Sequence, residues 1–266
     1  IILAAAALGL PACLVIDTPY NGLPPGTWRG VIKFEPSYIT PNPKGKPLPE
    51  KLNMEYEDVT QGELPFLFTV SYPSPDSFFL TLMLGGRQLI LSDYMVGKDF
   101  STAKDTITIR FPGSYHYIRG IFEEKILEGD WVFADAGGNE KRIPFTARQG
   151  QDYLFTTLRK PPAMDLSGAW SMRTGIEKDT TGEARLELIQ SGNMLQGILE
   201  WKGRRYEYLS GTVQARKLYL SYFDGEDAIL IEGKLDDDGA LLGAMRSGKE
   251  EKTLWQASKT NEINNK

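Results

Sequence analysis

The chain carries the triplet Gly26-Thr27-Trp28 and, later, the triplet Gly168-Ala169-Trp170, and each opens a strand-rich stretch. The two stretches also end alike, because Phe145-Thr146-Ala147 closes the first and Trp255-Gln256-Ala257 closes the second. Similar motifs recurring in the same order indicate an internal repeat, in which each copy is one structural unit. The sequence therefore predicts two tandem units built on one plan.

The segments between these motifs alternate apolar and polar residues, as in residues 66–71, 106–111 and 185–188. This alternation is typical of half-buried antiparallel strands. Between the strands stand turn residues, since Gly and Asn supply the positive φ that short hairpins need. The clearest turns are Gly85-Gly86, Gly137-Gly138-Asn139, Ser191-Gly192-Asn193, Lys202-Gly203, Asp224-Gly225 and Asp236-Asp237-Asp238-Gly239. We therefore expect an all-β protein of antiparallel strands with few, short helices.

The closure of each unit is open to two interpretations. A Gly and a Trp at the start of the first strand, followed by a meander of hairpins, resemble lipocalin-like and avidin-like barrels, in which the Trp plugs one end. A β-sandwich would produce much the same pattern. If the second unit is a barrel, large aliphatic residues such as Leu186, Leu188, Leu218 and Leu220 favour a filled interior.

Composition shifts suggest the following division of the chain. We assign residues 1–13 to a signal-peptide remnant, 14–24 to a tether, 25–157 to the first β-unit, 158–164 to a linker, 165–259 to the second β-unit, and 260–266 to a tail or the start of a further domain. Within the first unit, a proline-rich insertion near residues 40–62 predicts an exposed loop, because proline cannot donate ladder hydrogen bonds.

The first residues predict a lipid anchor. An uncharged apolar run, too short to cross a bilayer, leads into Leu10-Pro11-Ala12-Cys13. This tetrapeptide resembles a bacterial lipobox, whose Cys is lipidated. We therefore expect Cys13 to hold the protein on a membrane outside the cytoplasm, on the periplasmic or outer-membrane face.

Several kinds of chemistry are excluded by composition. With one Cys and one His, the chain can form neither an intrachain disulfide nor a zinc site built from Cys and His alone. The net charge of -5 supplies no field to hold nucleic acid. The chain has a single histidine, His116, and no G-x-S-x-G motif of a serine hydrolase. It also has no Gly-rich phosphate-binding loop. We expect no catalytic residue, no metal and no cofactor in this chain.

Six motifs carry a resemblance to a known family. They are residues 26–31, 62–66, 143–147, 166–170, 206–211 and 218–225. Together they resemble the N-terminal β-rich region of lipoproteins from Bacteroidetes-type bacteria, which precedes a thioredoxin-like domain of the TlpA/ResA type. The resemblance implies an accessory role, because the catalytic Cys-x-x-Cys of that family lies in the downstream domain and no position here matches it.

Three functions follow as hypotheses. In the first, the chain is a lipid-anchored, non-catalytic β-module of a thiol-disulfide oxidoreductase, with client proteins or a fused thioredoxin-like domain as partners. In the second, it is a stand-alone binding module for a small apolar ligand or a protein partner. Its ligand-facing aromatic residues would be Trp170, Trp201, Tyr206, Tyr208, Tyr222 and Phe223. A hydrolase, the third hypothesis, would need a pocket holding His116 or a convergent pair of carboxylates.

Overall fold

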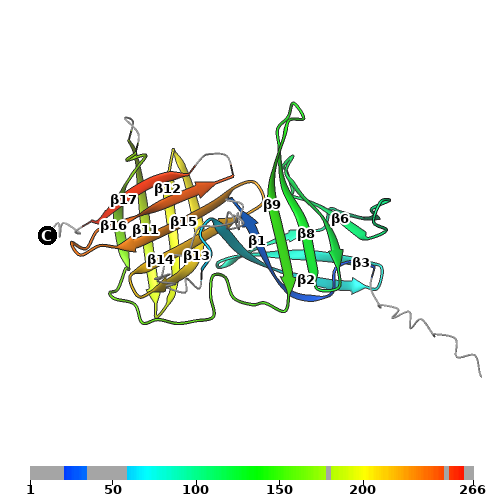
Figure 1. The fold of residues 1–266 in the computed structure, drawn as a ribbon, viewed down its shortest axis with the longest axis horizontal. Coiled ribbons are helices and arrows are strands. Elements are labelled where there is room, and N and C mark those ends of the chain that lie inside the picture. Colours follow the sequence, from blue (N-terminus) through cyan, green and yellow to red (C-terminus); the bar gives the residue numbers. More distant parts are fainter. Residues whose placement is uncertain (1–20, 35–58, 178–180, 249–251, 261–266) are drawn as a thin grey trace, which may run out of the picture.

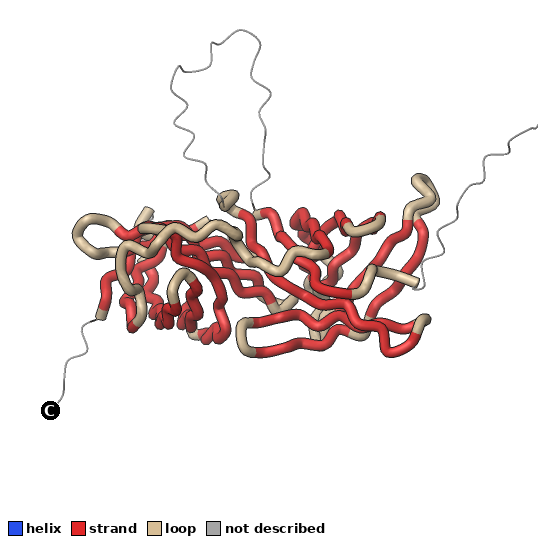
Figure 2. Tube along the Cα trace, turned by 90° about the horizontal axis from the view of Figure 1, so that it is seen from below, coloured by secondary structure: helices blue, strands red, loops and turns tan. Residues whose placement is uncertain are grey.

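The computed structural model describes residues 21–34, 59–177, 181–248 and 252–260. Over these ranges all regular elements are strands, as predicted, and Figure 2 shows only strands and loops. Within the same ranges there is no helix of sufficient length and apolarity to cross a membrane. Cys13 and most of the proline-rich insertion lie outside the described residues.

The first unit is an open, curved sheet, which we call the half-barrel (Figure 1). Its order is β4-β3-β2-β1-β9-β8-β7-β6-β5, with antiparallel pairing throughout. Its strands are β1 (Gly26–Lys33), β2 (Glu63–Ser74), β3 (Ser77–Leu84), β4 (Arg87–Leu91), β5 (Tyr94–Lys98), β6 (Asp105–Arg110), β7 (Tyr117–Glu123), β8 (Ile126–Ala134) and β9 (Glu140–Gln149).

The second unit is a closed up-and-down barrel, which we call the barrel. Closure comes from the pairing of its first strand with its last, and it decides between the barrel and sandwich alternatives. Its strands are β10 (Gly168–Thr174), β11 (Gly182–Ser191), β12 (Met194–Trp201), β13 (Arg204–Gln214), β14 (Lys217–Phe223), β15 (Ala228–Leu235), β16 (Leu241–Ser247) and β17 (Thr253–Lys259).

The two Trp residues of the repeated motifs occupy equivalent places. Trp28 and Trp170 are fully buried, and each indole Nε1 donates to the carbonyl oxygen four residues earlier, at 2.9 Å. Two residues before each Trp stands a Gly at the same φ of +117°, where a side chain would be strained. The predicted internal repeat is therefore present in the detailed geometry.

A pair of facing glycines also recurs, Gly120 with Gly129 in the half-barrel and Gly233 with Gly243 in the barrel. A Cβ on Gly129 would lie 2.1 Å from the Arg119 carbonyl oxygen, and one on Gly243 would lie 1.9 Å from that of Glu232. Only glycine permits this close approach of neighbouring strands.

The units differ in closure, because β4 and β5 lie at opposite edges of the half-barrel although only Ser92 and Asp93 separate them. The Asp93 carbonyl accepts from the Arg110 amide at 2.9 Å, so the chain already follows β6 here and does not turn back onto β4. The half-barrel therefore stays open.

The barrel supplies part of the half-barrel core. Strands β14 and β15 alternate between two apolar environments, because Leu218, Leu220, Ile229 and Ile231 face the barrel interior. Their neighbours Tyr219, Phe223, Ala228 and Leu230 belong to the core of the half-barrel. The two units therefore share a buried apolar surface and are not independent domains with separate cores.

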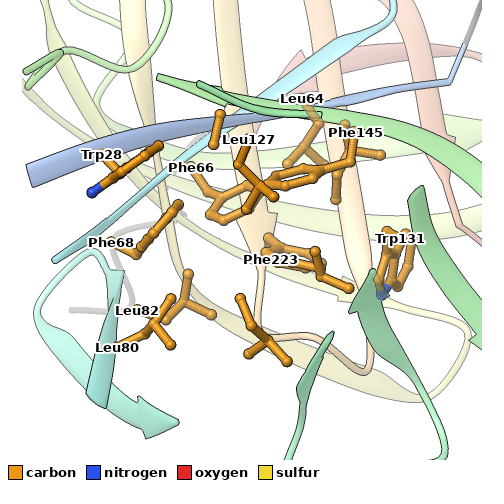
Figure 3. Close-up of a cluster of buried hydrophobic side chains, with 14 of the residues drawn as sticks. Trp28, Leu64, Phe66, Phe68, Leu80, Leu82, Leu127, Trp131, Phe145 and Phe223 are labelled. Carbon is orange, nitrogen blue, oxygen red and sulfur yellow. The ribbon is translucent and has the colours of Figure 1, made fainter. Parts of the chain in front are cut away.

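Phe223 is the centre of this contact. Its ring lies 4.4 Å from that of Phe66, 5.6 Å from Phe111 and 5.4 Å from Trp131, centroid to centroid. Figure 3 shows it surrounded by side chains of the half-barrel. Aromatic pairs at these separations add to the free energy gained by burial alone.

Buried polar contacts align the two units. The Glu232 carboxylate accepts a hydrogen bond from the Gly62 amide at 3.2 Å and forms an ion pair with Arg246. Both charged side chains are buried, so each compensates the desolvation of the other. This arrangement joins the start of β2 to β15 and β16.

We predict that Phe223→Ala lowers the free energy of unfolding by about 3–5 kcal/mol, because it leaves a cavity among rigid aromatic neighbours. Denaturant unfolding would measure the change, with Tyr115→Ala as the exposed control, since Tyr115 is 68% exposed. A loss below about 1 kcal/mol would contradict the packing role given to Phe223.

Candidate functional site

A groove lies where the turn between β3 and β4 meets the outer face of the barrel. Its volume is about 650 Å³. It is lined by Gly85, Gly86, Gly168, Ala169, Arg185, Glu187, Leu188, Ile189, Gln196, Gly197, Ile198, Glu207 and Tyr208. We call it the junction groove.

A smaller cavity of about 210 Å³ adjoins the junction groove, and Gly85 and Tyr208 line both. Its other walls come from β2, β3, the barrel and Leu154 of the connection between the units. The shared residues place Tyr208 between the two spaces.

A β-bulge gives Tyr208 its position. The register between β12 and β13 shifts between Gly197 and Leu199, so that Glu207 and Tyr208 together stand opposite Ile198. Tyr208 has a φ of +70°, which is rare and unfavourable for a bulky residue, and its side chain is 41% exposed. Strain of this kind concentrates at functional positions.

The β3–β4 turn contacts this bulge closely. A Cβ on Gly85 would lie 3.1 Å from both the Cβ and the carbonyl oxygen of Tyr208. Gly85 also has a φ of +52°, so the turn depends on glycine for space and for conformation. This contact forms one end of the junction groove.

The walls of the junction groove are amphipathic. Ile189 is 68% exposed, and Ile198 is partly buried beside it. Charged side chains border this apolar strip: Arg185 pairs with Glu187 at 2.7 Å, and Arg205 pairs with Glu207 at 3.1 Å and with Glu200. The site can hold an apolar body while presenting both signs of charge at its rim.

The structure does not bring the six predicted aromatic residues into one site. Trp170, Trp201 and Tyr206 are buried in the barrel core, and Phe223 enters the half-barrel core. Tyr208, Tyr222 and Phe223 all line the smaller cavity, and of these three only Tyr208 also reaches the groove.

Tyr222 is held by its own turn. Its hydroxyl donates to Asp224 Oδ2 at 2.7 Å. Burial and this hydrogen bond both raise the pKa of Tyr222 above its ordinary value, so the phenol stays protonated at neutral pH. It offers an aromatic wall to the smaller cavity.

His116 lies in the contact between the units. Its Nδ1 accepts from the Ala134 amide at 3.2 Å, and its Nε2 lies 3.6 Å from Glu226 Oε2. The same Glu226 oxygen accepts from Ser114 Oγ at 2.7 Å. The geometry joins the β6–β7 loop to the β14–β15 loop, with His116 5% exposed.

Several residues of the junction groove were not predicted from the sequence. Gly85-Gly86 was expected only as a turn, and Ile189 and Ile198 gave no signal beyond apolar residues on strands. No cluster of three or more metal-ligating side chains occurs in the described part of the chain.

Comparisons with known proteins give little further information. No protein-family model matches the chain, and no curated protein matches it significantly. A solved structure from Nostoc punctiforme, described as a protein with unknown function from the DUF3598 family, aligns with 14% sequence identity and a TM-score of 0.26. The alignment covers 88% of this chain and 96% of that chain. A TM-score this low does not establish a similarity from which function can be inferred.

We predict that Tyr208→Gly is more stable than Tyr208→Ala by about 1 kcal/mol, because both variants lose the ring but only glycine relieves the positive φ. Denaturant unfolding of the two variants side by side would measure the difference. Equal stabilities would show that the bulge at Tyr208 is not strained.

Proposed function

We propose that this protein is a non-catalytic binding module that takes a small amphipathic ligand in the junction groove. The observation that carries the proposal is Tyr208, a partly exposed aromatic residue held at positive φ between two adjoining spaces. A residue under strain with an accessible ring is better explained by contact with a ligand than by packing.

The chemistry of the walls supports an amphipathic ligand. Ile189, Ile198 and Tyr208 offer an apolar surface, and Arg185 and Glu207 stand at its border. Sites for small molecules commonly combine apolar walls with a few polar groups that fix orientation. An apolar body with one polar or charged end fits this distribution.

The packing of the barrel favours this site over a site inside the barrel. Trp170, Leu186, Leu199, Met245 and Trp255 are buried together in its interior. Side chains of that size fill the interior of a barrel of this kind. The ligand site proposed here therefore lies outside the barrel, at its contact with the half-barrel.

The probe for this proposal is 8-anilinonaphthalene-1-sulfonate, whose aromatic rings and single sulfonate match an apolar wall with a charged border. We predict that Tyr208→Gly weakens its binding at least about tenfold, since each tenfold is about 1.4 kcal/mol of contact. Fluorescence titration would measure the affinity, and Tyr115→Gly is the matched control.

A loss of probe binding in Tyr208→Gly would not reflect a loss of stability, because glycine relieves the backbone strain at this position while the ring is removed. Unchanged binding by Tyr208→Gly would overturn the assignment of the groove. Loss of binding in Tyr115→Gly as well would indicate a nonspecific effect and would overturn it too.

A second candidate rests on the sequence motifs that resemble lipoproteins with a thioredoxin-like domain. One of them, residues 218–225, contains Phe223 and most of the strand that joins the two units. In this candidate the junction groove serves to hold clients close to a redox domain, raising their effective concentration. A Cys-x-x-Cys encoded downstream in the same reading frame is the expected finding.

Both candidates include the proposed lipid anchor at Cys13. We predict that Cys13→Ser moves the protein from the membrane fraction to the soluble extracytoplasmic fraction of the expressing bacterium, because acylation needs the thiol. Fractionation followed by immunoblotting would measure this. A protein that stays with the membrane after the substitution would contradict lipid anchoring.

A further inference from the structure

A third space lies beside β1 of the half-barrel and shares no lining residue with the junction groove. Its volume is about 330 Å³. It is enclosed by β1, the start of β2 and the connection that follows β9. Its lining residues are Arg29, Val59, Thr60, Glu63, Tyr153, Phe155, Thr156, Thr157 and Leu158. We call it the Arg29 pocket.

Arg29 is held with part of its guanidinium unused. Its Nε donates to the Leu154 carbonyl at 2.6 Å, and its Cζ lies 4.9 Å from the centre of the Tyr153 ring. Over the described residues, no hydrogen bond or ion pair is formed by its two terminal nitrogens. These nitrogens are therefore available to a ligand.

The repeat gives a test of whether the fold needs this arginine. The residue after the motif Trp is Arg29 in the half-barrel but Ser171 in the barrel, where it is exposed. Since the barrel closes without a cation at this place, the shared architecture does not require one. Burial lowers the pKa of Arg29 below its ordinary value, although a guanidinium remains charged at neutral pH.

A carboxylate of opposite charge lines the same pocket. Glu63 lies near enough to Arg29 to act on it electrostatically, yet no ion pair within 4.0 Å joins them in the described chain. The pocket thus holds two partly buried, opposite charges that do not neutralise each other directly. Desolvated charges without a partner are costly, so a ligand that pairs with both would be favoured.

We propose that the Arg29 pocket binds a small zwitterion of the amino-acid class. Its carboxylate pairs with the terminal nitrogens of Arg29, which suit bidentate recognition. Its ammonium group pairs with Glu63, and its side chain lies against Val59, Phe155 and Leu158. A simple anion would be repelled by Glu63, and a simple cation by Arg29.

The test is calorimetric titration of the full chain with L-leucine and with two analogues of similar shape. The analogue 4-methylpentanoate lacks the ammonium group, and 3-methylbutylamine lacks the carboxylate. We predict that L-leucine binds at least about tenfold more tightly than either analogue, because each analogue leaves one partly buried charge without a ligand group to pair with.

Substitutions should remove one half of this preference at a time. In Glu63→Gln, L-leucine and 4-methylpentanoate should bind equally. In Arg29→Gln, L-leucine and 3-methylbutylamine should bind equally. The Glu63 carboxylate forms no hydrogen bond with the described residues, so Glu63→Gln keeps the test valid if Arg29→Gln loosens the connection at Leu154.

Two results would overturn the proposal. One is equal binding of L-leucine and both analogues to the unchanged protein, absence of binding included. The other is a preference for L-leucine over 4-methylpentanoate that survives Glu63→Gln. Tyr208→Gly should leave L-leucine binding unchanged, which separates this site from the proposed function of the junction groove.

Discussion

The insertion of Phe223 into the half-barrel is the contact on which the architecture depends. The half-barrel cannot bury its aromatic residues alone, because its sheet stays open between β4 and β5. The outer face of β14 and β15 supplies the missing apolar surface, with Phe223 between Phe66, Phe111 and Trp131. The junction groove exists because this contact fixes the β3–β4 turn against the barrel.

The two units show how one repeated strand order can give either a closed barrel or an open sheet. Both keep the motif Gly and Trp, the hydrogen bond of the indole and the facing glycines, all of which are local requirements of tight strand packing. They differ in closure, since β13 pairs with β14 whereas β4 does not pair with β5, an additional strand that follows β4 in the half-barrel. The open sheet leaves an apolar face, which β14 and β15 of the barrel cover.

Much of the fold could be predicted from the sequence. The triplets at Gly26 and Gly168, the alternating strands and the turn residues predict two antiparallel units, because strand pairing and turns are encoded locally. The opening between β4 and β5 was not predictable, since Ser92-Asp93 is as short as any hairpin connection. The contact between the units has a signal in the sequence, because β14 and β15 are apolar on both faces, which is typical of strands covered on both sides.

The candidate sites were less accessible to sequence reasoning. Tyr208 was named as a candidate, but its positive φ comes from a bulge that only the pairing of β12 with β13 reveals. Arg29 lies within the motif at residues 26–31, but the sequence alone gives it no role, because its neighbours Leu154, Tyr153 and Glu63 are distant in the chain. Sites assembled from long-range neighbours require the fold first.

The shared core has a consequence for the order of folding. During synthesis the half-barrel is made before the barrel. At that stage Phe66, Trp131 and the other residues of the half-barrel core lack their contacts with Phe223 and Leu230. The barrel, by contrast, has an interior of its own and closes as soon as β17 meets β10. The later half of the chain therefore serves as the template on which the earlier half completes its fold, and until then the earlier half exposes apolar surface that can aggregate.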